Sequence, residues 1–378
     1  MSSVQTPVVQ FGTSRFLQAH ADLFLHEAGM EDTVTIVASS GSAAGRARLQ
    51  AFSDPAGFPV MIRGLEDGRT VDRTIQVKSV RRGLDAEADW AELTRIVVEE
   101  AEFILSNTTE SGFAVPAGLV LDLTKATASA PPSYPAKLLA LLAARFAAGR
   151  SGLTILPTEL VGRNGDLLKR TVLDLAERSR ASNALLTWIS EQCVFANSLV
   201  DRIVSAPLDP AGAIAEPYAL WAVENQPGLK LPCTHPAIRI VDDLEPVERL
   251  KIHILNLGHS FLAETWLTGR MDADETVRGM LARPEIRNDL LSLYRDEVIP
   301  GFAAQGMGEA AGAYATTTLE RFENPFLDHR LADIASGHKT KVARRIGGFI
   351  EWAATADTNR KSPRLAAIAA KYAKEIAA

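Results

Sequence analysis

Short apolar strands alternate with helices through the first half of the chain, and this order limits the possible folds more than any other feature. The strands are expected at residues 7–12, 33–39, 101–106 and 151–157, with helices at 16–28 and 135–149. Strands that alternate with helices form parallel sheets, because each helix carries the chain back to the start of the next strand. The sequence therefore predicts an α/β domain with a parallel sheet.

The strand-and-helix pattern is interrupted once and later replaced. Residues 58–82 alternate in the manner of a β-hairpin, which we expect to be an insertion in the α/β domain. Residues 205–212 form a connector rich in Pro and Gly, and helical periodicity dominates from about residue 244 onward. We expect a dinucleotide-binding domain over residues 1–205 and a mainly α-helical substrate domain over residues 206–378.

Composition and charge narrow the classes of partner. The chain has 378 residues, of which 47% are hydrophobic and 23% charged, a profile typical of a soluble globular protein. Its formal net charge of −6 does not favour a nucleic acid or an anionic membrane as a partner. The N-terminal residues lack the basic and apolar regions of a signal peptide, and no apolar run approaches the length of a membrane span.

Cysteine use points to a reducing compartment. The sequence contains only Cys193 and Cys233, which do not supply a disulfide framework or a cysteine zinc site. A cytoplasmic location is therefore expected. The sequence leaves a monomer and a small homo-oligomer open.

A glycine turn follows the first expected strand. The segment Gly12-Thr-Ser-Arg-Phe16 lies at a strand-to-helix turn, where backbone amides favour an anion such as a dinucleotide pyrophosphate. The fingerprint G-x-G-x-x-G keeps only its first glycine here, because Ser14 and Leu17 occupy the other two positions. A dinucleotide site and an ordinary turn between strand and helix both fit this segment.

Two further segments bear on the cofactor. The second strand runs into Ala38-Ser39-Ser-Gly, with no carboxylate to bind a ribose diol, and this leaves NADP open beside NAD. Residues 106–112 form a polar loop after the third strand, at the edge where open α/β sheets bind ligands. This loop is expected either to line a nicotinamide site or to be a plain surface turn.

One helical stretch in the second half carries three polar side chains. Lys251, Asn256 and His259 stand at offsets of zero, five and eight in a run of Ile and Leu. In an α-helix of about 100° per residue, all three fall within one hemisphere. A lysine half-sunk in apolar surroundings loses solvation of its charged form, which suits a general base, although a lysine that snorkels to the surface is the structural alternative. The amide and imidazole could bind an alcohol oxygen, so the stretch indicates metal-free alcohol or carbonyl redox chemistry.

Other familiar site chemistries find no support in the sequence. None of the five tyrosines is followed by a lysine four residues later, so the Tyr-x-x-x-Lys pair is absent. Seven dispersed histidines and two distant cysteines do not supply clustered zinc ligands, and no G-x-S-x-G elbow occurs. The stretch around Lys251 remains as the redox centre.

Ordered sequence blocks point to one family. They lie at residues 11–20, 108–113, 164–166, 195–203, 216–221, 251–259 and 321–325, and they span most of the chain. With these blocks the chain resembles the long-chain mannitol dehydrogenase family, which includes polyol dehydrogenases and the tagaturonate and fructuronate reductases. The K-x4-N-x2-H block at residues 251–259 is the most specific of them.

The resemblance implies a fold, a cofactor and a set of roles. The fold would be a Rossmann-type domain followed by a largely helical domain, with catalysis in the cleft between them and with NAD or NADP but no metal. Lys251 would be the general acid/base, Asn256 an oxyanion donor and His259 the residue that orients the substrate. Asp201 would belong to the proton path, with a local ion pair to Arg202 as the structural alternative. The cofactor-binding residues are expected to be Gly12, Ser14, Arg15, Phe16, Ser39, Thr108 and Glu110.

One departure from the family bears on the substrate. Polyol-oxidising members carry Ser-Cys-Asp-Asn before their Asn-Gly pair, and that asparagine is a second oxyanion donor. Here the stretch is Pro157-Thr-Glu-Leu160, so a leucine takes its place and Asn164 becomes the candidate donor. The form Pro-x-Glu-Leu resembles the tagaturonate reductases, whereas the short chain leaves a compact polyol dehydrogenase open.

We therefore expect an NAD(P)-dependent oxidoreductase acting on a sugar alcohol, such as a hexitol or pentitol, and its ketose. A hexuronate reductase is the alternative, with Arg330, Lys339 and Lys341 as candidates for binding the substrate carboxylate and exposed helix charge as the structural alternative for each. A non-catalytic dinucleotide-binding sensor on the same fold is the alternative from another class of function.

Overall fold

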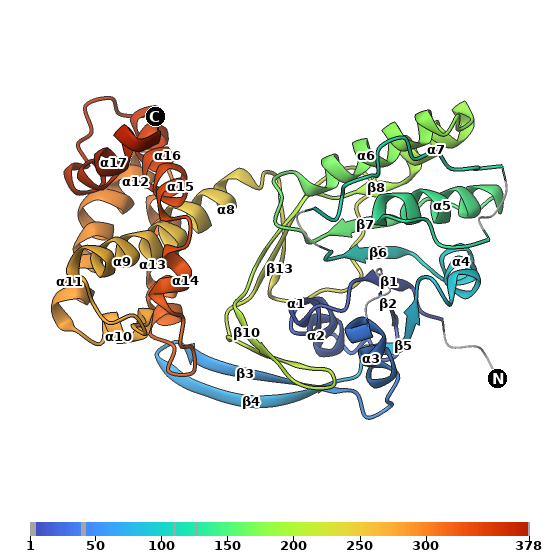
Figure 1. Cartoon of the computed structure of the whole chain (residues 1–378), viewed down its shortest axis with the longest axis horizontal. Coiled ribbons are helices and arrows are strands. Elements are labelled where there is room, and N and C mark those ends of the chain that lie inside the picture. The colour runs from blue at the N-terminus through green and yellow to red at the C-terminus, as the bar shows by residue number, and fades with distance from the viewer. Residues whose placement is uncertain (1–4, 39–42, 109–110, 125–127, 377–378) are drawn as a thin grey trace. The chain divides into compact units, whose positions relative to one another are not determined.

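The computed structural model describes residues 5–38, 43–108, 111–124 and 128–376 (Figure 1). The strands are β1 (Val8–Phe11), β2 (Val34–Ala38), β3 (Phe58–Glu66), β4 (Arg69–Val77), β5 (Val80–Asp85), β6 (Phe103–Ser106), β7 (Thr154–Pro157), β8 (Val194–Phe195), β9 (Ser198–Asp201), β10 (Val204–Pro207), β11 (Ala213–Ala215), β12 (Leu220–Glu224) and β13 (Ile238–Val241). The helices up to residue 250 are α1 (Arg15–Gln18), α2 (Ala21–Glu27), α3 (Ala43–Phe52), α4 (Trp90–Glu99), α5 (Tyr134–Ala147), α6 (Asn164–Arg178), α7 (Asn183–Gln192) and α8 (Glu245–Leu250).

The remaining elements are all helical. The α-helices are α9 (Leu257–Gly269), α10 (Val277–Leu281), α11 (Pro284–Leu293), α12 (Ile299–Ala304), α13 (Gly308–Phe322), α14 (Leu331–Ala335), α15 (His338–Val342), α16 (Gly348–Ala354) and α17 (Pro363–Ile376). Three segments are π-helical, namely η1 (Lys251–Asn256), η2 (Tyr294–Val298) and η3 (Ala343–Gly347). No helix among the described residues is both long and apolar enough to cross a bilayer.

A six-stranded parallel sheet organises the N-terminal part of the chain. Its order is β5-β2-β1-β6-β7-β8, and each neighbouring pair of strands is parallel. Numbered along the chain within this sheet, the order is 3-2-1-4-5-6, the order of the Rossmann fold. The predicted α/β class with a Rossmann-type domain is confirmed. The order reverses between β1 and β6, and the carboxyl ends of these strands are where such sheets bind ligands.

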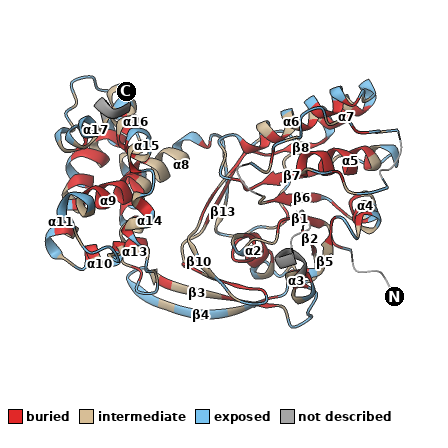
Figure 2. Cartoon of the chain, viewed as in Figure 1, coloured by how far each residue is buried: buried red, intermediate tan, exposed pale blue. Residues whose placement is uncertain are grey.

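Buried apolar strands and helix faces build this domain. β1 reads Val-Val-Gln-Phe and is buried throughout, as expected for a strand covered on both faces. Helices α4 to α7 share one apolar core with β1, β6 and β7 (Figure 2). Helix α3 packs against β2 and β5. The sheet is thus held rigid by its own packing, which fixes the positions of the turns at its edges.

The predicted insertion is a hairpin of β3 and β4. Its turn residues, Asp67 and Gly68, have φ angles of 52° and 72°, which suit the Asp-Gly turns that match the twist of paired strands. The hairpin ends at Val77, however, and residues 80–85 form β5, the edge strand of the Rossmann sheet. The expectation that the hairpin runs to residue 82 was wrong, because alternation alone does not separate a hairpin strand from the strand that follows it.

The helix expected over residues 16–28 is broken in two. His20 has φ −127° and ψ −91°, outside the helical region, and its ring packs against Phe16 and Phe24 with centroid distances of 4.7 and 4.5 Å. At the break, the carbonyl oxygen of Ala19 accepts a hydrogen bond of 2.6 Å from Nη1 of Arg202. The break is therefore stabilised by tertiary contacts that periodicity does not reveal.

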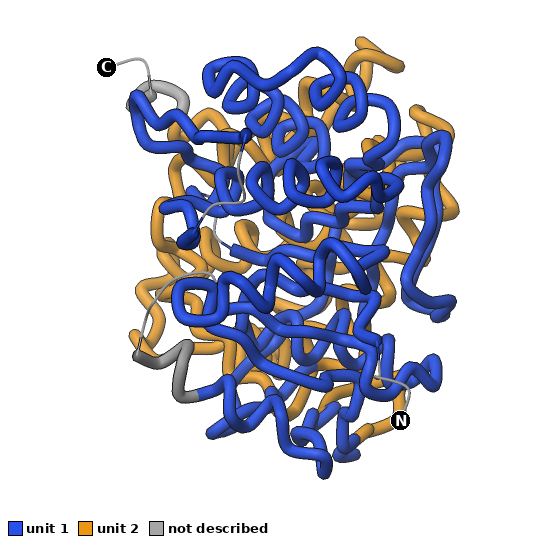
Figure 3. The backbone as a smooth tube through the Cα atoms, turned by 90° about the vertical axis from the view of Figure 1, so that its right-hand side faces the viewer, with its two compact units in different colours: residues 1–62, 73–215, 219–244 blue, residues 63–72, 216–218, 245–378 orange. Residues whose placement is uncertain are grey.

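The chain forms two compact units, coloured separately in Figure 3. Unit 1 comprises Met1–Ile62, Arg73–Ala215 and Ala219–Leu244, and unit 2 comprises Arg63–Asp72, Glu216–Tyr218 and Glu245–Ala378. Strands β10 to β13 thus belong entirely to unit 1, although the composition changes near residue 205. The assignment of cofactor binding to residues 1–205 and of the substrate to residues 206–378 stays a prediction.

Unit 2 is helical around its own core, as predicted for the C-terminal region, and two short segments from earlier in the chain complete it. A guanidinium nitrogen of Arg321 pairs with the Glu216 carboxylate at 2.9 Å, with both side chains almost fully buried. Nδ2 of Asn324 donates to the carbonyl oxygen of Arg63 at 3.1 Å. These contacts fasten the hairpin tip and residues 216–218 to helix α13 and the turn after it.

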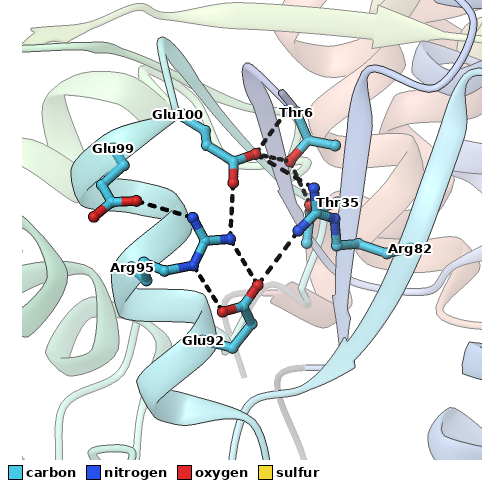
Figure 4. A network of polar contacts seen from close by, with 7 residues as sticks. All are labelled: Thr6, Thr35, Arg82, Glu92, Arg95, Glu99 and Glu100. Atoms are coloured by element: carbon cyan, nitrogen blue, oxygen red, sulfur yellow. Dashed lines mark hydrogen bonds and ion pairs between the residues drawn. The ribbon is translucent and has the colours of Figure 1, made fainter. Parts of the chain in front are cut away.

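A polar network closes the amino end of the Rossmann sheet. It consists of Thr6, Thr35, Arg82, Glu92, Arg95, Glu99 and Glu100 (Figure 4). Glu100 accepts from the backbone N–H of Thr6 at 2.8 Å and pairs with Arg95 at 2.9 Å. Because Thr6 precedes β1 and Glu100 follows α4, this network joins helix to sheet at the edge opposite the ligand-binding edge, so we interpret it as structural.

Candidate active site

Gly12 forms the turn at the carboxyl end of β1. It has a φ of 119°, a conformation that favours glycine, and its N–H donates to the carbonyl oxygen of Val37 at 2.9 Å. A Cβ at this position would lie 2.6 Å from the carbonyl oxygen of Asn107, which follows β6. Glycine therefore allows the ends of β1 and β6 to approach closely at the point where the strand order reverses.

Ser14 connects this turn to the polar loop after β6. Its Oγ caps helix α1 by accepting from the N–H of Leu17 at 3.3 Å, and it donates to Oδ1 of Asn107 at 2.9 Å. Nη1 of Arg48, on helix α3, donates to the carbonyl oxygen of Thr13 at 3.4 Å. The turn thus has one half-buried cation beside it, which suits a phosphate-bearing ligand.

The other predicted cofactor residues are placed as follows. Arg15 is exposed, with Nη1 at 3.5 Å from the carbonyl oxygen of Ser205, and Phe16 is half-buried against His20. Ser39 and Glu110 lie outside the described residues.

Glu159 positions Thr108 in the loop after β6. Its Oε1 accepts from both the N–H and Oγ1 of Thr108 at 2.9 Å, and its Oε2 accepts from Oγ of Ser106 at 3.0 Å. Burial raises the pKa of Glu159, while the bonds from Thr108 and Ser106 act in the opposite direction. Sequence reasoning did not assign this residue a role, although it lies within the Pro-x-Glu-Leu block that was singled out.

Asn164 is buried and fully engaged with backbone groups. Its Nδ2 donates to the carbonyl oxygens of Pro157, Glu159 and Ser198 at 3.0–3.1 Å, and its Oδ1 accepts from the N–H groups of Gly165 and Ser198 at 2.9 Å. An amide nitrogen has two N–H groups, so none is left for a substrate oxygen. The expectation that Asn164 replaces the missing oxyanion donor is therefore not supported by its geometry, which fits a structural pin between β7 and β9.

Leu160 and Asp201 differ in exposure. Leu160, in the position of the family's second donor, is 68% exposed, which is unusual for a leucine. Asp201 ends β9 and is buried, opposite Leu220 of β12. Its neighbour Arg202 directs Nη1 to the carbonyl oxygen of Ala19.

The stretch that carries Lys251 and Asn256 is π-helical. Helices α8 and α9 are joined by η1 into one continuous helical run, and the N–H of Leu257 bonds to the carbonyl oxygen of Ile252, five residues earlier. A π-helix bonds residues five apart, so Lys251 and Asn256 lie nearly above one another. The α-helical geometry expected for this stretch, with about 100° per residue, was wrong. Such π segments are rare and occur often at functional sites.

Side chains from two other π-helical segments contact η1. Oη of Tyr294 in η2 donates to the carbonyl oxygen of Ile254 at 2.9 Å. Nη1 of Arg345 in η3 donates to the carbonyl oxygen of Asn256 at 3.2 Å and to Oγ of Ser260 at 3.1 Å. These donors bond carbonyl groups of the π-helical segment and hold its geometry.

Two buried histidines of this helical run differ in their surroundings. Nδ1 of His253 lies 3.0 Å from the carbonyl oxygen of Arg345, and burial lowers the pKa of His253 to about 4, so the ring is neutral and structural. His259 stacks on Phe322 at 4.4 Å and meets His329 edge-on at 4.9 Å. Lys251, Asn256 and His259 therefore share one continuous helical run in unit 2.

Arg330 is engaged elsewhere. Its guanidinium pairs with Asp274 at 2.6 Å, and both side chains are largely exposed. Among the described residues, no group of three or more His, Cys, Asp or Glu could hold a metal ion.

A Rossmann sheet with a glycine turn at its switch point, followed by a helical unit with a lysine-bearing π segment, defines a dinucleotide-dependent oxidoreductase. Residues 6–233 match the mannitol dehydrogenase Rossmann domain, and residues 243–374 match the mannitol dehydrogenase C-terminal domain. The chain belongs to the mannitol dehydrogenase family. The predicted family and enzyme class, an oxidoreductase with an NAD-binding Rossmann domain, are confirmed.

Known proteins of two kinds are similar to this chain. The altronate oxidoreductase of Bacillus subtilis (strain 168) is 29% identical over 89% of this chain and 73% of its own length, and that of Halalkalibacterium halodurans is 30% identical over 91% and 70%. Solved structures of a D-sorbitol dehydrogenase (TM-score 0.77, covering 92% of this chain and 76% of its own) and of Pseudomonas fluorescens mannitol 2-dehydrogenase with NAD and D-mannitol (TM-score 0.69, 94% and 78%) are each 20% identical. The latter two show the shared fold.

Proposed function

We propose that the protein is an NAD(P)-dependent oxidoreductase that interconverts a secondary alcohol of a sugar acid or sugar alcohol and the corresponding ketone. The observation that carries this proposal is the array of Lys251, Asn256 and His259 on one helical run with a π-helical segment. Membership of the mannitol dehydrogenase family supports a redox role for this array. A cytoplasmic location and the number of subunits stay predictions.

The residues at the carboxyl edge of the Rossmann sheet fit a dinucleotide. Gly12 allows the ends of β1 and β6 to approach closely at the switch point, Ser14 orders the helix start, and Arg48 supplies positive charge. Thr108, held by Glu159, lies in the next loop along this edge. When bound, the nicotinamide ring supplies the acceptor or donor of hydride. NAD is the expected cofactor, and the missing carboxylate after β2 keeps NADP open.

Lys251 is proposed to move the proton. In oxidation, its neutral amine takes the hydroxyl proton of the substrate, and in reduction its ammonium returns a proton to the oxyanion. Nδ2 of Asn256 donates to the developing alkoxide, while His259 binds a neighbouring hydroxyl of the substrate and orients its carbon chain. Asp201, at the end of β9, is proposed to belong to the proton path.

The comparisons favour a sugar acid over a sugar alcohol. The relatives at 29–32% identity are altronate oxidoreductases, whereas the polyol dehydrogenases are similar in fold at 20% identity. Leu160, in place of the asparagine of polyol-oxidising members, supports the same choice. We therefore propose a sugar acid of the altronate type as the preferred substrate, with a hexitol or pentitol as the alternative.

The proposal is tested by following reduced-nicotinamide absorbance with altronate, mannonate, mannitol and sorbitol, each with NAD and with NADP. The variant Lys251→Ala should lose about 10³-fold in kcat, the usual effect of a general acid/base, while it still binds NADH. Lys230→Ala, an exposed lysine in unit 1, is the matched control. Near-native turnover by Lys251→Ala would refute the mechanism. Dinucleotide binding without turnover on the whole panel would instead support the non-catalytic sensor.

A further inference from the structure

Arg345 is a half-buried cation that contacts the helix of the proposed active site. Its Nη1 makes both of its side-chain hydrogen bonds, to the carbonyl oxygen of Asn256 and to Oγ of Ser260. Its Nε and Nη2 make no hydrogen bond with the part of the chain that the structure describes, and no described carboxylate pairs with it. The edge of the Arg345 guanidinium that carries Nε and Nη2 therefore has no hydrogen-bond partner among the described residues, although it lies in a side chain that contacts Asn256.

A guanidinium withdrawn from water without an acidic partner is costly. Burial lowers the pKa of Arg345 to about 10, and the adjacent Arg344 acts in the same direction. Within folded proteins, arginines removed from solvent usually pair with a carboxylate or another anion. The position of Arg345 therefore suggests that its partner is a ligand.

Lys341 adds a second cation to the same place. It precedes Arg345 by four residues, so the two side chains project from the same side of the helical run. Its Nζ donates to the carbonyl oxygen of Ile334 at 2.8 Å, and no described carboxylate pairs with it. Burial and then the charge of Arg345 lower the pKa of Lys341. Two like charges at this spacing repel each other unless an anion lies between them.

Two acidic side chains of the same helical unit, Glu264 and Asp333, interact with other residues. Glu264 is bound by His338, Lys371 and Tyr372 at 3.1, 2.5 and 2.6 Å. Asp333 is exposed, and its charge favours the protonated form of His329, whose pKa burial lowers. The ring of His329 meets that of His259 edge-on. Positive charge therefore remains in excess beside Asn256 and His259.

We propose that Arg345, with Lys341, binds the carboxylate of a sugar-acid substrate and thereby determines specificity against neutral polyols. This inference rests on the proposed function, since it assigns a binding site to the same substrate. The Arg345 fork can hold two carboxylate oxygens, and Lys341 adds a point charge. Arg330, another candidate from the sequence, is less suited because its guanidinium already pairs with Asp274.

The test compares acids with alcohols of the same configuration. Wild type, Arg345→Met, Lys341→Met and the control Arg344→Met, an exposed neighbour, are assayed with NAD on altronate and mannonate and on altritol and mannitol. We expect Arg345→Met to raise KM for the acid substrate by about 100-fold or more and Lys341→Met to raise it less, because each removes one partner of a buried charge pair. KM for the alcohols should rise far less than KM for the acids, and Arg344→Met should behave as wild type.

Three results would overturn the inference. An equal rise in KM for acid and alcohol in both Arg345→Met and Lys341→Met would indicate a structural role only. Turnover of alcohols but not acids by the wild type would also refute it, while leaving the proposed oxidoreductase function intact. Turnover of none of the four substrates would refute both proposals. Because Arg345 also bonds to the helix, thermal unfolding of each variant is measured, and Lys341→Met decides the matter if Arg345→Met does not fold.

Discussion

Tyr294 donates a buried hydrogen bond of 2.9 Å to the carbonyl oxygen of Ile254, inside the π-helical segment that carries Lys251 and Asn256. The close approach of the Tyr294 ring to this helix depends on Gly258, since a Cβ there would lie 2.0 Å from Oη of Tyr294. A π-helix displaces carbonyl groups from their usual partners, and a buried carbonyl left unpaired costs free energy. The Tyr294–Gly258 contact thus helps to explain why the helix departs from α geometry at this point.

Tyr294→Phe should loosen the π segment. It removes one buried hydrogen bond, so we expect a loss of about 1–2 kcal/mol in the free energy of unfolding. Because Asn256 and Lys251 would lose part of their fixed spacing, kcat should fall by about tenfold, whereas the affinity for NADH, whose proposed site lies in unit 1, should stay unchanged. Urea denaturation, turnover and NADH titration measure these quantities.

Gly258→Ala provides the matched test. In the wild type the new methyl group collides with Oη of Tyr294, whereas in the Tyr294→Phe background this oxygen is gone. We expect Gly258→Ala to destabilise the wild type by several kcal/mol and the Tyr294→Phe variant by clearly less. Strictly additive effects would show that the contact does not hold the segment in place.

Asn164→Asp separates a structural role from an oxyanion role. Aspartate keeps the shape but replaces the N–H donors that serve three backbone carbonyls, so we expect a loss of about 3 kcal/mol in stability. An oxyanion donor would behave differently, with kcat reduced about 10²–10³-fold and stability nearly unchanged. Thermal unfolding and kcat per folded molecule distinguish the two roles, and the second pattern would contradict the structural interpretation.

Sequence reasoning succeeded where local pattern and fold agree. The apolar strands and the turn at Gly12 carry local signals from which a parallel α/β sheet follows, and the alternating hairpin carries its own. The Rossmann type of this sheet was implied by the family resemblance. The offset of five between Lys251 and Asn256 is visible in the sequence, but the apolar pattern around it predicts an α-helix. A π segment depends on donors far away in sequence, here Tyr294 and Arg345, and so periodicity could not predict it.

The same limit applies to the remaining site residues. Asn164 was singled out by its place in a motif, but only the backbone groups that surround it in space show that its amide is engaged. Glu159 stands in the same motif, and its bonds to Thr108 join two loops 51 residues apart. Arg345 lies in a stretch rich in basic residues, where burial rather than sequence distinguishes it from Arg344.

Arg48 should influence the choice of cofactor. Its guanidinium bonds to the carbonyl oxygen of Thr13 in the glycine turn, and no carboxylate follows β2 to bind a ribose diol. We expect Arg48→Met to weaken NADPH binding by about tenfold and NADH binding less, since the 2′-phosphate adds negative charge. Titration of protein fluorescence with each dinucleotide measures both affinities, with the substitution of an exposed residue of helix α6, Arg178→Met, as the control. Equal weakening of both would show that Arg48 does not discriminate between them.

Asp22 should make stability depend on pH. It is fully buried, and burial raises its pKa from 3.8 to about 7, although a hydrogen bond of 3.2 Å from Gln10 acts in the opposite direction. The native state therefore holds a proton that the unfolded chain has lost, and stability is greatest below the unfolded pKa. As the pH rises from about 4 to about 7, the free energy of unfolding should fall by about 1.4 kcal/mol per pH unit from this group.

Asp22→Asn should remove this dependence. Its amide stays neutral and can donate to Oε1 of Gln10, which has no hydrogen-bond partner among the described residues. Relative to the wild type, the free energy of unfolding of the variant should rise by about 2–3 kcal/mol between pH 5 and pH 8, because only the wild type must keep a buried carboxyl protonated. Urea denaturation at intervals across this range measures the difference, with exposed Asp174→Asn as the control for the loss of one carboxylate. If the free energies of unfolding of Asp22→Asn and of the wild type changed in parallel with pH, Asp22 would not hold a proton in the native state.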